Sequence, residues 1–109
     1  MIRVPENLFF WVGEKPTATP CRYEDLDGAL IASIAGATLT AQCKIDTETG
    51  AEVAVTCTNT GDGTFTINWA KGVTASNFTK AGSMRIDVKV VQGDYTWYMD
   101  RFSIPIRDR

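Results

Sequence analysis

Histidine is absent from the sequence. Because histidine is the commonest general base and the commonest metal ligand in proteins, its absence excludes Ser/His/Asp and Cys/His catalytic arrangements. The chain also lacks a run of about 18 or more apolar residues, which a membrane-spanning helix needs. We therefore expect no hydrolase of the usual kinds, no cofactor and no membrane partner.

Positive charge is not in excess either. The 109 residues carry a net charge of −2 at pH 7, and the sequence pI is about 5.0. Nucleic-acid-binding domains usually show a basic excess, so we expect no nucleic-acid partner. A chain of this length forms one domain that buries roughly two-thirds of its unfolded surface.

A secretory signal is missing as well. The apolar stretch LFFWVG, Leu8–Gly13, follows Glu6 and ends at Glu14–Pro16. A signal peptide has a basic head, an apolar run of about 7 to 15 residues and a small-residue cleavage site. We expect a protein that is made and used without export.

Alternating apolar and polar residues fill much of the chain, a pattern that indicates strands with one buried face. Polar turns at 47–50, 61–63 and 93–94 separate the runs, and the first two runs predict a hairpin. The apolar positions are Leu39, Ala41, Cys43 and Ile45, then Val53, Val55 and Cys57, then Phe65, Ile67 and Trp69, then Met84, Ile86, Val88 and Val90.

The last apolar run changes its parity. It contains two sets in succession: Trp97 and Met99, then Phe102, Ile104 and Ile106. Since one extra residue moves the following side chains to the other face of a strand, we predict a β-bulge near Asp100–Arg101.

Helical patterns are nearly absent. Only 73–78 could hold a helix, and the β-branched Val73 and Thr74 favour a loop with at most one helical turn there. The closely spaced short strands predict an all-β fold, an antiparallel β-sandwich of about seven strands in a single domain. We place the domain at 8–106, with an N-terminal tail at 1–7 and a C-terminal tail at 107–109.

The three cysteines are open to two interpretations. Cys43 and Cys57 have inward parity on neighbouring strands, which allows a cross-strand disulfide, whereas Cys21 lies in a polar loop. Without an export signal we favour three reduced thiols. A zinc site needs a fourth ligand and C-x₂-C spacing, so we predict no metal site.

The sequence DLDG, Asp25–Gly28, begins like a calcium-binding loop. The resemblance ends at Gly36, where such a loop carries its closing Glu. We favour a turn in which Asp side chains bond nearby amides and the Gly takes a positive φ. A carboxylate-pair enzyme using Glu24, Asp25 and Asp27 is a third hypothesis of function.

Aromatic residues suggest another class of function. A row of aromatic rings on a sandwich face could hold a glycan, and the candidates are Trp69, Trp97, Tyr95, Tyr98 and Tyr23. Trp69 has inward parity, which favours the core and leaves Tyr95 and Tyr98 as the best members. A carbohydrate-binding or adhesion module is therefore the alternative function.

Five features follow one another in three segments, RYEDLDGALIASIAGATLTAQCKIDTETG, NTGDGTFTINW and FTKAGSMRIDVKVVQGDYTWYMDRFSIPI. They are a D-x-D-G turn, a G-A-T-L-T stretch, a D-G before an aromatic strand, a K-A-G turn and a final F-x-I-x-I strand. In this order, over roughly residues 20 to 106, the chain is similar to the immunoglobulin-like N-terminal domain of phage baseplate upper proteins.

The resemblance implies an immunoglobulin-like sandwich and a non-enzymatic bacteriophage virion structural protein with no catalytic residues. Such a module is made in the host cytoplasm and docks on capsid, neck or tail/baseplate proteins in the virion. The implied partners are other virion structural proteins and, as a homo-oligomer, the protein itself. The family's long C-terminal portion does not follow the last strand here, which suits a small accessory protein.

The stretch at 8–12 is apolar on both of its faces. A strand of this kind is covered on both faces or lies at a contact. We expect strand addition to a neighbouring subunit, with an ordinary intramolecular strand as the alternative. The predicted protein-interface residues are Leu8, Phe9, Phe10, Trp11, Tyr95 and Tyr98.

Overall fold

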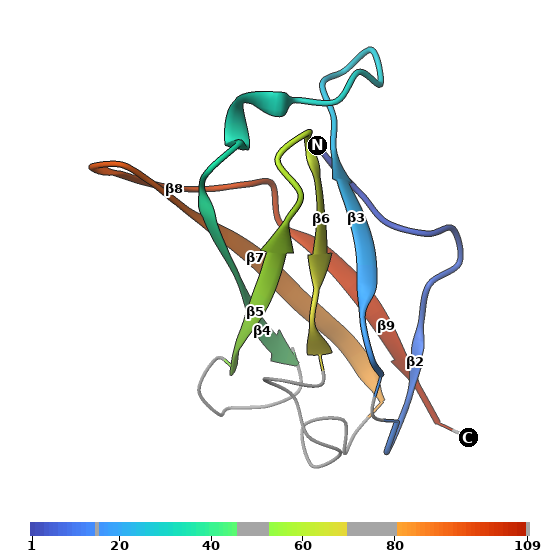
Figure 1. Cartoon of the computed structure of the whole chain (residues 1–109). Helices are drawn as coiled ribbons and strands as arrows, with labels where there is room; N and C mark the ends of the chain where they lie inside the picture. Colours follow the sequence, from blue (N-terminus) through green and yellow to red (C-terminus); the bar gives the residue numbers. More distant parts are fainter. Residues whose placement is uncertain (15, 46–52, 70–80, 109) are drawn as a thin grey trace.

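Nine strands make up most of the described chain (Figure 1). The computed structural model describes residues 1–14, 16–45, 53–69 and 81–108, and the predicted turn at 47–50 and loop at 73–78 lie outside these ranges. The strands are β1 (Ile2–Arg3), β2 (Phe10–Trp11), β3 (Thr19–Tyr23), β4 (Thr38–Ile45), β5 (Val53–Asn59), β6 (Thr64–Ile67), β7 (Gly82–Gln92), β8 (Tyr95–Tyr98) and β9 (Phe102–Arg107). A short 3-10 helix, η1 (Ala32–Ile34), precedes β4. The predicted all-β fold is confirmed.

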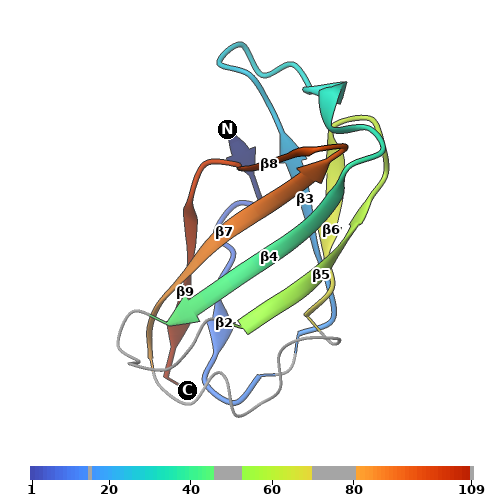
Figure 2. The same cartoon turned by 90° about the vertical axis from the view of Figure 1, so that its left-hand side faces the viewer.

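The strands form one mixed sheet that curls into two facing halves (Figures 1 and 2). Their order is β1-β3-β6-β5-β4-β7-β9-β2, and β8 pairs with β7. The curl occurs at β5, because residues 53–56 pair with β4 whereas residues 57–59 pair with β6. The two halves enclose the core, so the sandwich-like architecture and the predicted hairpin of β4 and β5 are both confirmed.

Strand β2 departs from the antiparallel prediction. It runs parallel to β9, with Phe10 opposite Ile106 and Trp11 opposite Arg107. After β2 the chain crosses to β3 in the other half of the sheet, so no hairpin joins β2 to its partner and dictates an antiparallel pair. The other strand pairs of the described residues are antiparallel.

Both segments predicted as tails, 1–7 and 107–109, contain strand residues. Ile2 lies opposite Tyr23 in the pair of β1 and β3, and Arg107 is the last residue of β9. The half-buried side chain of Ile2 packs against the core. Burial of this apolar side chain stabilises the pairing of β1 with β3.

The core lies between the two halves of the sheet and follows the predicted alternation. Trp69 is fully buried, and its indole N–H donates a 2.7 Å hydrogen bond to the Thr19 hydroxyl. The ring of Phe10 meets it edge-on, with centroids 5.5 Å apart. The inward-facing residues of β4 and β7 complete this layer: Leu39, Ala41, Cys43, Met84, Ile86, Val88 and Val90.

The predicted bulge is present between β8 and β9, which both pair with β7. Lys89 lies opposite Tyr98, whereas Ile86 lies opposite Phe102. Three steps along β7 therefore match four steps along the partner, and one residue is extra. The bulge near Asp100–Arg101 is confirmed, and it keeps both apolar sets on the inner face.

The cysteines do not form the cross-strand pair that the sequence allowed. Cys43 lies opposite Val53, and Cys57 lies opposite Ile67 of β6, so the two are not neighbours across the ladder. All three cysteines are thiols, and Cys21 is buried in β3 rather than placed in a polar loop. Burial raises the pKa of Cys21 to about 12 and that of Cys57 to about 11, as expected for structural thiols.

Candidate ligand-binding face

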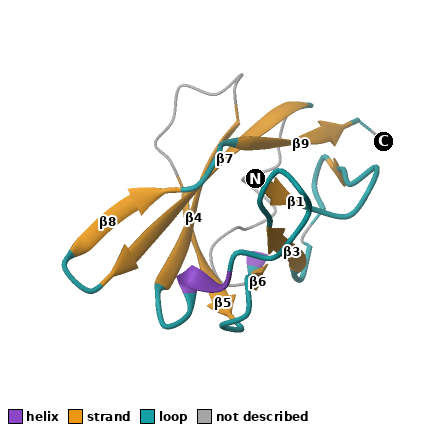
Figure 3. Ribbon diagram, turned by 90° about the horizontal axis from the view of Figure 1, so that it is seen from above, coloured by secondary structure: helices purple, strands orange, loops and turns teal. Residues whose placement is uncertain are grey.

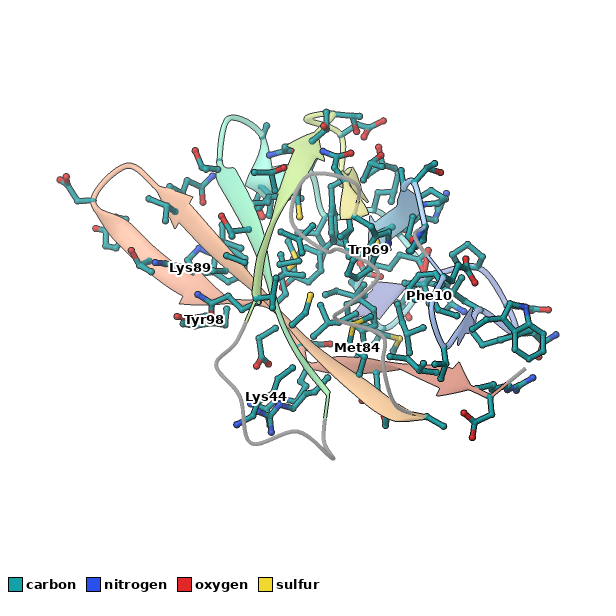
Figure 4. The ribbon with its side chains drawn as sticks, turned by 90° about the horizontal axis from the view of Figure 1, so that it is seen from below. Phe10, Lys44, Trp69, Met84, Lys89 and Tyr98 are labelled. Atoms are coloured by element: carbon teal, nitrogen blue, oxygen red, sulfur yellow. The ribbon has the colours of Figure 1, made fainter. Side chains whose placement is uncertain are left out.

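Polar side chains cover the solvent side of β4, β7 and β8. We call this surface the outer face, and its members are Gln42, Lys44, Arg85, Asp87, Lys89, Tyr98 and Arg101. Alternation along β7 and β4 turns these residues away from the core. Figure 4 shows Lys44, Lys89 and Tyr98 along one side of this sheet, whereas Phe10 and Trp69 lie between its two halves.

The strand register sets which outer-face residues are neighbours. Gln42 lies opposite Asp87, and Tyr98 lies opposite Lys89. Directly opposed residues on one face have Cβ atoms about 5 Å apart. Figure 3 shows the hairpin of β7 and β8. Its register places the Tyr98 ring at the edge of a row of polar groups.

A shallow hollow of about 400 Å³ lies on the outer face, lined by Gln42, Asp87, Tyr98 and Arg101. The bulge directs Arg101 toward Asp87. The Arg101 Nε donates to Asp87 Oδ1 at 2.8 Å, and Nη2 donates to Oδ2 at 3.2 Å. A two-point ion pair of this kind holds both side chains in a defined orientation.

The groups around the hollow suit a ligand with many hydroxyl groups. The Gln42 amide can donate and accept, the Asp87 carboxylate accepts, and the Arg101 guanidinium donates. Tyr98 is 53% exposed and lines the hollow, so its ring is available for stacking. A polar hollow beside one aromatic ring can bind the edge of a sugar through hydrogen bonds and its apolar face through the ring.

The two predicted aromatic residues do not share a face. Tyr98 has the outward parity, whereas Tyr95 lies opposite Gln92 at the tip of the hairpin with the opposite parity. Tyr95 is 76% exposed and does not line the hollow. The other candidates lie elsewhere: Trp69 is in the core, and Trp97 is half-buried with its ring 6.2 Å from that of Tyr23.

The predicted interface at the N-terminal strand is divided between the core and the surface. Leu8 packs against the core and Phe10 is part of it, which the interface prediction for these two residues did not anticipate. Phe9 and Trp11 lie on the other side, edge to face with centroids 4.9 Å apart. The Arg107 guanidinium covers the Phe9 ring at 4.2 Å, so this aromatic pair is partly screened by its own chain.

The acidic residues of the DLDG turn hold local structure. Asp25 Oδ1 accepts hydrogen bonds from the amides of Asp27 at 2.9 Å and Ala29 at 3.0 Å, and Gly28 has a φ of +85°. The predicted turn is therefore confirmed. Glu24 is buried and engaged by two arginines, so it does not face Asp25 or Asp27 as a catalytic partner would.

Acidic and thiol side chains are dispersed over the part of the chain that the structure describes. No group of three or more Cys, Asp or Glu side chains gathers there as a metal site would require. None of the helices in the described ranges has the length and apolar character to cross a membrane.

We compared the chain with known proteins and found a similarity to a solved structure. No family model and no curated protein matches the chain. Among solved structures, the chain is similar to PcoC, a methionine-rich copper resistance protein from Escherichia coli. The match has 16% identity and a TM-score of 0.43, and it covers 91% of this chain and 88% of that one. At this level of likeness, copper binding is not carried over to the present chain.

The prediction of a bacteriophage virion structural protein is corrected by this comparison. The solved structure that the chain resembles is named as a copper resistance protein, and no family model or curated protein supports a virion component, so we withdraw the predicted function. The motif resemblance to phage baseplate upper proteins stays a prediction, because no family model matches.

Sequence reasoning missed Gln42, Asp87 and Arg101 as site residues. The alternation had placed Gln42 and Asp87 on the wet faces of two separate strands, which was the available signal. Only the register shows that they are direct neighbours, and only the bulge shows that Arg101 reaches them.

Proposed function

We propose that the protein is a non-enzymatic carbohydrate-binding module that holds a glycan on the outer face. The observation that carries the proposal is the hollow of about 400 Å³ between Tyr98 and the paired side chains of Asp87 and Arg101. A shallow hollow of this kind leaves its ligand largely exposed, which suits a segment of a longer chain rather than an enclosed small molecule. The ring of Tyr98 supplies stacking area. The ion pair of Asp87 and Arg101, together with the Gln42 amide, supplies directional hydrogen bonds.

The proposal of a non-catalytic role rests on the lack of histidine and on the contacts of the acidic side chains. The sequence has no histidine, and two of the three acids considered for a carboxylate pair, Glu24 and Asp25, are engaged in structural contacts. Both carboxylate oxygens of Asp87 accept hydrogen bonds from Arg101, an arrangement that suits a binding surface.

The test is binding to a panel of soluble polysaccharides by affinity electrophoresis, with positive ligands measured by calorimetry. We expect Tyr98→Ala to weaken binding at least tenfold, because truncating an aromatic anchor residue commonly costs about 2 kcal/mol or more, and about 1.4 kcal/mol is tenfold. Tyr95→Ala is the matched control, since it removes the same side chain from the same hairpin but outside the hollow. Thermal unfolding of both variants separates loss of binding from loss of fold.

Two results would overturn the proposal. One is the absence of binding to any polysaccharide of the panel by the intact protein. The other is equal weakening by Tyr98→Ala and Tyr95→Ala, which would show that the hollow is not the binding site.

A further inference from the structure

The outer face is more basic than the molecule to which it belongs. The whole chain has a net charge of −2, yet this face gathers four cationic side chains around one carboxylate, Asp87: Lys44, Arg85, Lys89 and Arg101. The register explains the gathering, because Lys44 lies opposite Arg85, and Asp87 follows two residues later along β7.

The single carboxylate of the face is already engaged. Asp87 receives both hydrogen bonds of Arg101 and is only 17% exposed, so little of it remains to neutralise other cations. Within the described residues, Lys44, Arg85 and Lys89 form no ion pair with a carboxylate.

The position of Lys44 and Arg85 is unfavourable for the sheet itself. Like charges directly opposite one another in an antiparallel pair are destabilising. Both residues are half-buried, and long cationic side chains generally keep their charged ends in water. An anion placed between the two charged ends would relieve this repulsion.

The position of Lys89 links this charge to the aromatic ring. Lys89 is the direct cross-strand neighbour of Tyr98, so its ammonium group lies beside the place where a sugar ring would stack (Figure 4). The row of Lys44 and Arg85 lies four residues further along β7, a distance of about 13 Å. A ligand that contacts both rows is longer than one sugar ring and carries acidic groups along its length.

We propose that the glycan is acidic, a polysaccharide that carries carboxylate or sulfate groups. This inference rests on the proposed function. Arg85 can bind either oxyanion with two parallel N–H donors, and Lys44 and Lys89 act as point charges beside it. A sugar ring can stack on the Tyr98 ring, whereas a polyanion without rings cannot, so Tyr98 favours an acidic polysaccharide.

The experiment compares matched pairs of polysaccharides that differ in charge alone. Polygalacturonate is set against its methyl-esterified form, and dextran sulfate is set against dextran, each at low salt and at about 0.15 M salt. We expect measurable affinity for at least one acidic member and at least tenfold weaker binding of its neutral partner. The two pairs also distinguish a carboxylate ligand from a sulfate ligand.

Variants of Arg85 and Lys89 test whether these cations cause the preference for acidic polysaccharides. The double variant Arg85→Gln, Lys89→Gln should lose about tenfold in affinity for the acidic polysaccharide, since each exposed pair contributes up to about 1 kcal/mol. Arg107→Gln, at the C-terminal end of β9 and outside the outer face, is the control that removes one positive charge elsewhere. Polyglutamate serves as a polyanion without sugar rings.

Each outcome has a distinct meaning. Equal binding of charged and neutral partners, lost in Tyr98→Ala, would overturn the acidic ligand while the carbohydrate-binding function stands. Binding to polyglutamate as tight as to the acidic polysaccharide, and unchanged in Tyr98→Ala, would overturn the inference in favour of a general polyanion surface. Binding to none of these polymers would overturn both proposals.

Discussion

Two arginines neutralise the buried carboxylate of Glu24. The side chain is 5% exposed; Arg3 of β1 hydrogen-bonds to it, and Arg22 Nε of β3 donates to its Oε2 at 3.1 Å. The hydrogen bond from Arg3, assisted by Arg22, lowers the pKa of Glu24 from its ordinary value of 4.5. A lowered folded-state pKa contributes stability above the unfolded value, and this contribution is lost as the pH falls through the folded value.

We predict that Glu24→Gln lowers the free energy of unfolding at about pH 7, because the neutral amide leaves two arginines without their shared partner. The difference from the parent protein should shrink between about pH 7 and about pH 3, because the ion-pair contribution is lost as the pH falls through the lowered pKa of Glu24. Urea unfolding at the two pH values measures this directly.

Asp27→Asn is the matched control for that experiment, since it makes the same chemical change at an exposed carboxylate outside the cluster of arginines. It should have little effect at either pH. A destabilisation by Glu24→Gln that is constant between the two pH values would contradict the ion-pair account.

Individual residues could be placed from the sequence where they belong to long strands. The parity of Trp69 predicted a core position, and the residue is fully buried. The burial of Glu24 was not predictable in this way, because it depends on β1. A strand of two residues is too short to show alternation.

Among the elements, the bulge could be predicted from the sequence pattern, whereas the pairing of strand β2 could not. A change of parity is a local signal, so the bulge near Asp100–Arg101 could be predicted from the chain alone. The pairing of β2 with β9 joins segments from opposite ends of the chain. No turn residues encode that pairing, and its parallel direction therefore appeared only in the structure.

The turn between β5 and β6 packs closely against the start of η1. Gly63 has a φ of +98°, and a Cβ placed there would lie 3.0 Å from the Leu30 Cβ and 3.1 Å from the Ile31 backbone. Its carbonyl also accepts a 2.8 Å hydrogen bond from the Tyr23 amide. This glycine thus joins the turn to β3 and to the segment before η1.

We predict that Gly63→Ala destabilises the protein by about 1–3 kcal/mol more than Gly28→Ala, because it adds a steric clash to the backbone strain. Gly28 has a similar φ of +85°, and a Cβ added to it would meet no atom within 4 Å, so this variant isolates the conformational cost. Chemical denaturation measures both. Equal losses of unfolding free energy in the two variants would show that close packing against Leu30 and Ile31 does not contribute to the effect.

At the scale of the whole molecule, the curl of the sheet decides which residues meet. Gln42, Asp87 and Arg101 come from three separate parts of the chain, and each looks like an ordinary polar residue in the sequence. The fold class followed from alternation, but the outer face required the register of three strands. The motif order indicated a phage protein, a function that we have withdrawn, and a sandwich fold by itself does not identify a function because it serves many.

The most direct test of the central claim is amide chemical-shift mapping by NMR while the tightest-binding polysaccharide fragment is titrated into the protein. The account predicts shifts concentrated at Gln42, Asp87, Lys89, Tyr98 and Arg101, with Tyr95 and Phe9 little changed. Shifts confined to the edge of β2 and β9, or no shifts at saturating ligand, would contradict it.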